Sequence, residues 1–294
     1  MDQIIEQMLK QHNTQTAYDK KNGIKEVVQE IVLCGLSRAG FFKNAAFYGG
    51  TALRIFYGLD RFSEDLDFSL KASDPSFDFS EYLPVLEKEI RAYGLNFKME
   101  VNEKSFDSDI KSAFLKGNTK EHMLLFYADA QLTRSIGSSE LIKVKFEVDT
   151  NPPDYATFET KYRLLPMPYE IMLYDMPSLF AGKIHAVICR AWKNRVKGRD
   201  LYDYVFYLSR GTAVNLAHIA ARLAQSGYIS AEEQITIEDL KEILRKRFVN
   251  IDYTQAKHDV VPFIKNLSAL DVWNADFFCE ITEGLKEDIE NKID

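Results

Sequence analysis

Along the first half of the chain, apolar and polar residues alternate with periods that predict both helices and strands. Residues 16–39 are expected to form one helix, because apolar side chains recur at intervals of three and four: Ile24, Val27, Val28, Ile31, Val32 and Leu36. Shorter segments follow in the order strand, helix, strand, helix, strand: 44–48, 52–57, 65–70, 80–93 and 96–101. Residues 104–139 are ambiguous, and no element is assigned to them.

The clearest strand in the sequence covers residues 141–150. Its side chains alternate between an apolar and a polar set, which therefore point to opposite faces of a sheet. The apolar set is Ile142, Val144, Phe146 and Val148, and the polar set is Lys143, Lys145, Glu147 and Asp149. Two further strands are predicted at 157–165 and 171–174.

The predicted secondary structure changes near residue 175. Strands alternate with helices before this point, and almost everything after it is predicted to be helical. Helices are expected at 177–194, 200–209, 215–225, 237–247 and 253–267, with a last one towards the C-terminus. We therefore expect an α+β domain over residues 1–175 and a helical domain over residues 176–294.

Composition narrows the class of protein. Hydrophobic residues make up 46% of the chain, which is typical of a globular protein, and the formal net charge of −7 argues against broad coating of nucleic acid. The three cysteines are far apart in the sequence and fit neither a zinc site nor a disulfide framework. We find no export signal and no apolar run that could span a membrane, so we expect a cytoplasmic protein without a membrane partner.

A double glycine and two aspartates carry the first candidate chemistry. Gly49 and Gly50 lie between a strand and a helix, where glycine lets the backbone approach a phosphate. Asp65 and Asp67 are two residues apart on a predicted strand and so face the same side, an arrangement that is costly unless a cation binds there. Mg²⁺ is commonly held by one or two carboxylates together with substrate phosphates. The segment therefore predicts a metal site for phosphoryl-group chemistry.

A third carboxylate is expected from a neighbouring strand. The polar face of the strand at 141–150 offers Glu147 and Asp149, and their spacing does not choose between them. Metal ions bound by Asp65, Asp67 and one of these residues would stabilise both the entering and the leaving oxygen of the transfer.

These motifs resemble those of the DNA polymerase β superfamily of nucleotidyltransferases. In that pattern a Gly-Ser turn precedes a short helix, an Asp-x-Asp strand and a later acidic strand, and this chain has Gly50-Thr51 at the turn. The strings Gly-Gly-Thr-Ala-Leu-Arg at 49–54 and Arg-Phe-Ser-Glu-Asp-Leu-Asp-Phe at 61–68 are more specifically similar to the AbiEii family. The resemblance implies an α+β fold: a nucleotidyltransferase core with a mixed sheet and flanking helices, followed by a helical C-terminal module.

Two later motifs extend the resemblance to about residue 207. Lys183 lies in Ala-Gly-Lys-Ile-His-Ala, and Asp200 and Asp203 lie in Gly-Arg-Asp-Leu-Tyr-Asp-Tyr. The resemblance implies catalytic roles for Ser63, Asp65, Asp67, Lys183 and one of Asp200 or Asp203, and nucleotide binding by Gly49, Gly50, Thr51, Arg54 and Lys183. In physical terms, a lysine supplies a compact positive charge for phosphate oxygens. One aspartate would accept a proton or orient Lys183, and the other would cap or dock its helix.

The resemblance also implies a function. AbiEii proteins are toxins of abortive-infection (phage-defence) toxin–antitoxin systems, so we expect an NTP substrate, Mg²⁺ or Mn²⁺, transfer to RNA such as the tRNA 3′ end, and a cognate antitoxin. Two alternatives stay open: transfer to a protein or to a small molecule such as an aminoglycoside, and a non-catalytic relic that binds nucleotide or RNA.

One dense basic segment surrounds Trp192, and its members are Arg190, Lys193, Arg195, Lys197 and Arg199. It is consistent equally with a solvated helix end and with contacts to an RNA backbone. His185, close to Lys183 in sequence, is expected to lie on a different face of the helix and to be structural or exposed rather than catalytic.

Overall fold

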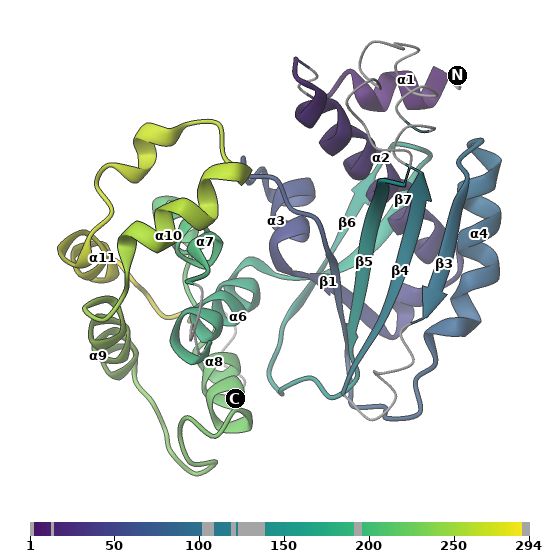
Figure 1. Cartoon of the computed structure of the whole chain (residues 1–294). Helices are drawn as coiled ribbons and strands as arrows, with labels where there is room; N and C mark the ends of the chain where they lie inside the picture. The colour runs from purple at the N-terminus through teal and green to yellow at the C-terminus, as the bar shows by residue number, and fades with distance from the viewer. Residues whose placement is uncertain are drawn as a thin grey trace. The chain divides into compact units, whose positions relative to one another are not determined.

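The computed structural model describes residues 3–12, 15–101, 109–118, 122, 139–190 and 196–289 (Figure 1). Its helices are α1 (Gln3–Leu9), α2 (Ala17–Arg38), α3 (Gly49–Tyr57), α4 (Leu83–Ala92), α6 (Met176–Cys189), α7 (Gly198–Ser209), α8 (Leu216–Gln225), α9 (Ile237–Phe248), α10 (Tyr253–Val260) and α11 (Ala275–Thr282). Its strands are β1 (Ala45–Tyr48), β2 (Leu66–Leu70), β3 (Phe97–Val101), β4 (Ile110–Asn118), β5 (Leu141–Asp149), β6 (Phe158–Arg163) and β7 (Tyr169–Tyr174).

The chain divides into two compact units, each of which is made of three separate segments of the sequence. The first contains Met1–Thr51, Glu64–Pro152 and Thr160–Leu173, and the second contains Ala52–Ser63, Pro153–Glu159 and Tyr174–Asp294.

The first unit is built on a mixed seven-stranded sheet in the order β3-β4-β5-β2-β1-β7-β6. The central strand β2 is antiparallel to β1 and parallel to β5. Helices α2 and α4 pack against each other and lie on the same face of the sheet (Figure 1). The predicted alternation in β5 is confirmed, because its apolar residues are buried and Glu147 and Asp149 remain half-exposed.

Helix α2 confirms the helix predicted at residues 16–39. Thr16 caps its N-terminus, and the Thr16 hydroxyl and the Asp19 carboxylate each accept the other's backbone N–H in a capping box. The predicted apolar stripe from Ile24 to Leu36 is fully buried. A capped helix with one buried face gains most of its stability from that packing rather than from helix propensity.

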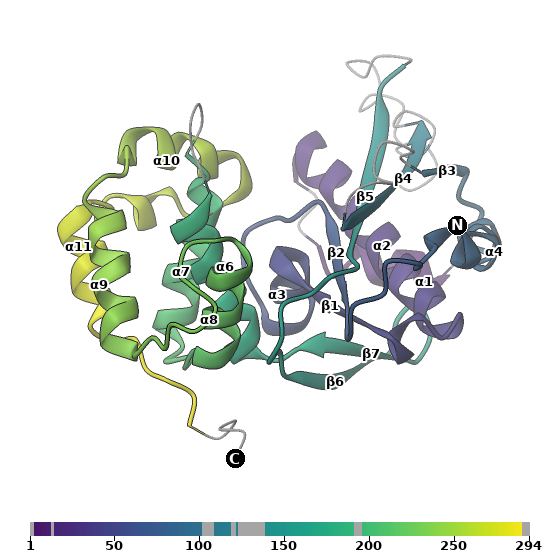
Figure 2. The same ribbon diagram turned by 90° about the horizontal axis from the view of Figure 1, so that it is seen from below.

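The second unit contains helices α6 to α11 (Figure 2). Its core is aromatic: Phe180 stacks on Tyr207 with ring centroids 4.6 Å apart, and Phe248 packs against Tyr204 and Phe278. Each of these rings is almost completely buried, and aromatic burial of this kind dominates core energetics.

Several predicted boundaries differ from the structure for identifiable reasons. The helix predicted at 52–57 begins earlier, at Gly49, so Thr51 lies inside α3, and its hydroxyl donates to the Asp65 carbonyl. The helix predicted at 253–267 ends at Val260 and continues only as a 3-10 turn over Val261–Phe263, since Pro262 lacks an N–H to donate. No sequence pattern predicted helix α1 or strand β4.

In the described part of the chain, none of the helices is both long and apolar enough to cross a bilayer. All three cysteines lie in that part, and all three are free thiols, in agreement with the predicted lack of a disulfide framework.

Candidate active site

The Asp67 carboxylate occupies the space beside Gly49 in the predicted metal site. Tyr48, the last residue of β1, is paired with Asp67 of β2, which brings the Asp67 side chain beside the turn at Gly49. A β-carbon on Gly49 would collide with the Asp67 carboxylate, and the φ angle of Gly49 is +82°. Both the space and the backbone conformation therefore require glycine at this position.

Asp65 lies immediately before β2, and a hydrogen bond to its carbonyl holds its backbone in place. The buried Thr51 hydroxyl donates to the Asp65 carbonyl at 2.5 Å. The preceding residue, Glu64, is tied to α2 through its carbonyl, which accepts from the Gln29 amide at 2.9 Å, and its carboxylate, which is 2.6 Å from Lys25 Nζ. The segment that carries both aspartates is thus anchored at the turn and at α2.

The register between β2 and β5 separates the two candidates for the third carboxylate. Asp67 is aligned with Glu147, whereas Asp149 is aligned with Ser69 further along the strand. Because aligned residues of parallel strands point to the same face, Glu147 is the neighbour of Asp67. The Asp149 carboxylate instead accepts the Asn151 N–H at 3.0 Å, and Glu147 lies 2.6 Å from Lys145 Nζ.

These oxygen donors suit a hard cation. Among the described residues, no group of three or more His, Cys, Asp or Glu side chains is already gathered as a metal cage. Mg²⁺ rarely uses such a cage, since it keeps waters and binds through one or two carboxylates and substrate phosphates. A carboxylate lodged against a glycine, with a second carboxylate in register beside it, fits that mode of binding.

Lys183 is the centre of an ion-pair cluster in the second unit. Its ammonium lies 2.8 Å from Asp200 Oδ1 and 2.8 Å from Asp203 Oδ2. Two of its three N–H donors are therefore directed at carboxylates, which leaves the third for another acceptor. Asp200 does not cap α7, because the helix begins at Gly198, and its other oxygen lies 2.7 Å from Arg190 Nη1.

Arg61 completes this cluster, and sequence reasoning missed it. Its Nε and Nη2 donate to the two oxygens of Asp203, each at 2.6 Å, and the two side chains are 4% and 0% exposed. Burial alone would raise the pKa of Asp203, but Arg61 and then Lys183 outweigh burial and hold that pKa below its usual value. Both Asp203 oxygens are thus occupied by cationic donors.

The remaining predicted residues have structural contacts of their own. Arg54 donates to the Leu59 and Asp60 carbonyls at 3.4 and 3.0 Å, which holds the loop after α3. Ser63 is buried at the end of that loop. Gly50 lies in the first turn of α3.

His185 of α6 is half-buried. Its Nε2 atom is buried without a hydrogen-bond partner, and burial, followed by Arg222 and Arg190, lowers the pKa of His185 to about 4.

The basic segment predicted around Trp192 lies partly outside the described residues, because 191–195 are not described. Of its members in the described part, Arg199 lies over the Phe263 ring at 4.2 Å.

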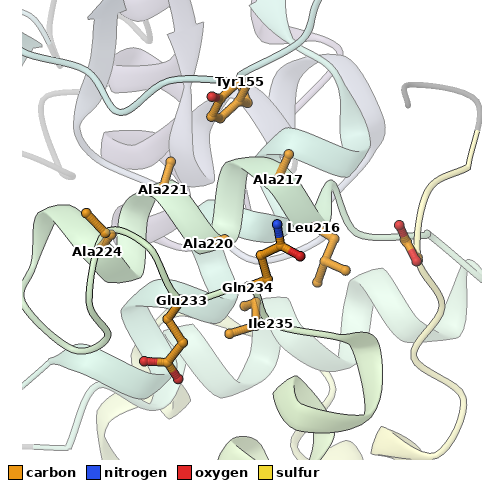
Figure 3. A pocket seen from close by; sticks show the side chains of 11 residues that line it. Tyr155, Leu216, Ala217, Ala220, Ala221, Ala224, Glu233, Gln234 and Ile235 are labelled. Carbon is orange, nitrogen blue, oxygen red and sulfur yellow. The ribbon is translucent and has the colours of Figure 1, made fainter. Parts of the chain in front are cut away.

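A pocket of about 450 Å³ occurs elsewhere in the second unit, beside α8 (Figure 3). The pocket is lined by Ala217, Ala220, Ala221 and Ala224 of α8 together with Tyr155 and Glu233, among others. It contains none of the predicted site residues.

Two solved structures are similar to this chain. MenT4, a nucleotidyltransferase toxin from Mycobacterium tuberculosis, is 16% identical, and the match covers 98% of this chain and 91% of that chain with a TM-score of 0.54. JHP933 from Helicobacter pylori is 17% identical over 89% of this chain and 88% of that chain, with a TM-score of 0.46. The likeness to MenT4 shows the fold alone, and it confirms the predicted α+β nucleotidyltransferase architecture.

A comparison with curated proteins gives no match. The model of the family described as nucleotidyl transferase AbiEii toxin, type IV toxin–antitoxin system, matches residues 31–279 of the 294. This match includes every predicted site residue from Gly49 to Asp203. The chain therefore belongs to the AbiEii family of nucleotidyltransferase toxins, as its sequence motifs predicted.

Proposed function

We propose that this toxin transfers a nucleotide from an NTP to an RNA acceptor, the 3′ end of tRNA in particular, in a reaction that depends on Mg²⁺ or Mn²⁺. The observation that carries the proposal is the Asp67 carboxylate held against Gly49, with Glu147 in register beside it. A buried or crowded carboxylate pair is unfavourable without a cation, and the double glycine leaves room for phosphates.

In this proposal Asp65, Asp67 and Glu147 would hold the metal. The cation would supply positive charge to stabilise the entering and leaving oxygens of the transfer. An acceptor hydroxyl oxygen attacks the α-phosphorus, the bond from that phosphorus to the pyrophosphate oxygen breaks, pyrophosphate leaves, and the hydroxyl proton passes to solvent water. Backbone N–H groups at Gly49 and Gly50 face the triphosphate, since the start of a helix is a ready anion site.

We assign Lys183 to the phosphate oxygens and Asp200 and Asp203 to its positioning. The support for this assignment is that both carboxylates contact the Lys183 ammonium and are themselves bound by arginines. A carboxylate whose oxygens are already paired with cations is a poor proton acceptor. Arg54 and Ser63 remain candidates for contacts to the nucleotide.

The family implies an antitoxin as the second component of the system. We propose a role in abortive infection by phage, in which uncontrolled nucleotide transfer to an essential RNA arrests the host cell.

The test is nucleotide transfer by the purified protein. Each α-³²P-labelled NTP is incubated with total RNA and Mg²⁺, with EDTA and with an Asp65→Ala, Asp67→Ala variant as controls. Label in a tRNA-sized band, lost with EDTA and in the variant, supports the proposal. Label in protein or in a small molecule instead would show that the acceptor is not RNA. Transfer by the Asp65→Ala, Asp67→Ala variant would show that these aspartates do not form the metal site.

A further inference from the structure

Arg222 of α8 lies over α6 at the residue that precedes Lys183. A β-carbon placed on Gly182 would be 3.8 Å from the Arg222 guanidinium carbon. A β-carbon at this position would be in ordinary van der Waals contact with the guanidinium, so Arg222 lies directly beside α6 at Gly182. Both residues belong to the second unit.

A buried histidine fixes the direction of this guanidinium. His218 Nδ1 is 2.7 Å from the Asp154 carbonyl, which can only accept, so Nδ1 carries the proton. His218 Nε2 is consequently an acceptor, and Arg222 Nη1 donates to it at 3.3 Å. Burial, followed by Arg222, lowers the pKa of His218 to about 3, so this acceptor persists at neutral pH. A positioned guanidinium is the arrangement that recognition of an oxyanion requires.

The guanidinium has no carboxylate to neutralise it within the described part of the chain. His218 is its hydrogen-bond partner, and its Nε is buried without an acceptor. The other arginines around Lys183 differ, because Arg61 is paired with Asp203 and Arg190 with Asp200. The nearby His185 Nε2 is also buried without a partner. Arg222 therefore keeps a positive charge that is not paired with a carboxylate of the described residues, in a chain with a net charge of −7.

We infer that Arg222 binds a phosphate group of a substrate through the Nη edge of its guanidinium, with His218 as the residue that positions it. A guanidinium matches phosphate with parallel N–H···O bonds and cannot lose its charge at neutral pH. The inference rests on the proposed function for the source of the phosphate, which is either the backbone of the RNA acceptor or the triphosphate of the NTP.

The test measures binding rather than transfer, so it does not depend on whether the protein is active. A fluorescein-labelled single-stranded RNA and each Mg²⁺-NTP are titrated against wild type, Arg222→Gln and Arg222→Lys over a range of salt concentrations. The matched control is Arg245→Gln, since Arg245 of α9 is an exposed arginine already paired with Glu283. Thermal melting checks that each variant folds.

If the phosphate belongs to RNA, Arg222→Gln weakens RNA binding about tenfold and reduces the slope of log K against log salt by about 0.7, the value for one lost phosphate contact. Arg222→Lys recovers the salt slope, and the control changes neither. If the phosphate belongs to the NTP, only NTP affinity falls. Unchanged affinity for both probes in a folded variant overturns the inference.

A second measurement uses the wild-type protein alone. Phenylglyoxal modifies accessible arginines, and mass spectrometry reports the modified fraction at Arg222 with and without RNA or Mg²⁺-NTP. Protection of Arg222 by one of these probes supports the inference, and equal modification in their presence contradicts it. Failure of the Asp65 and Asp67 variants to abolish transfer would overturn the proposed function and leave this result standing.

Discussion

At the scale of single residues, the site depends on the close approach of the Asp67 carboxylate to the backbone of Gly49. Gly49 leaves the volume that the Asp67 carboxylate occupies, and its φ angle of +82° is one that L-residues with a side chain rarely adopt. The sequence indicated the glycine and both aspartates through their spacing. The sequence could not show that Asp67 lies against Gly49, because that contact depends on the pairing of β1 with β2.

Gly49→Ala should remove most nucleotide transfer. The added methyl group strains the backbone by about 1–2 kcal/mol and also displaces Asp67. Gly94→Ala is the matched control, because Gly94 has a φ angle of +72° but a β-carbon there would meet no atom within 4 Å. We expect similar losses of unfolding free energy but full transfer by the control. Equal transfer rates in the two variants would show that the Asp67 contact is unimportant.

Glu147→Gln and Asp149→Asn distinguish the two candidates for the third carboxylate. Register places Glu147 beside Asp67, so its loss should slow transfer about 100-fold or more, as expected for a residue that holds a charge-stabilising ion. Asp149→Asn should change the rate less than about threefold. Single-turnover rates at saturating NTP decide between them, and the reverse order would assign the role to Asp149.

At the scale of helices, α6 and α7 are joined to the loop after α3 through buried charges. Arg61 and Asp203 are separated by 142 positions, and no local pattern in the sequence announces their pairing. The Asp200 and Asp203 motif was found by resemblance, but the partners that fix its geometry were not. Helix periodicity predicts which face is buried, whereas a buried ion pair is specified by tertiary packing.

Arg61→Met should strongly destabilise the second unit. Removing one partner leaves the Asp203 carboxylate buried with Lys183 alone, and such losses cost about 3–5 kcal/mol of unfolding free energy. Arg245→Met removes an exposed arginine from its pair with Glu283 and should leave the midpoint of urea denaturation nearly unchanged. Equal midpoints for the two variants would mean that the buried pair contributes no more than the exposed one.

Stability should fall as the solution is acidified from pH 7 towards pH 5. The folded pKa values of His185 and His218, about 4 and about 3, lie below the ordinary value of 6.5. Between these values the unfolded chain binds protons that the folded chain does not, so stability is complete above the unfolded pKa and declines as pH falls. Thermal melting of His185→Gln should show a weaker decline. The control is His258→Gln on the exposed side of α10, which should retain the wild-type profile.

At the scale of the whole molecule, regular elements were predictable and their pairing was not. The strand at 141–150 was evident from its two-residue alternation, and α2 from its apolar stripe between Ile24 and Leu36. The order of the seven strands and the parallel pairing of β2 with β5 are long-range features with no signal in either strand. Family resemblance supplied the function that these patterns alone did not.

The most direct test of the account is the rate of nucleotide transfer by Asp67→Asn, a substitution that keeps the shape of the side chain and removes its charge. Its control is Asp74→Asn, which changes an exposed aspartate in the loop after β2. A metal site stabilises the transition state by several kcal/mol, so the account predicts a loss of about 1,000-fold or more for Asp67→Asn and a wild-type rate for the control. A wild-type rate for Asp67→Asn would contradict the proposed metal site.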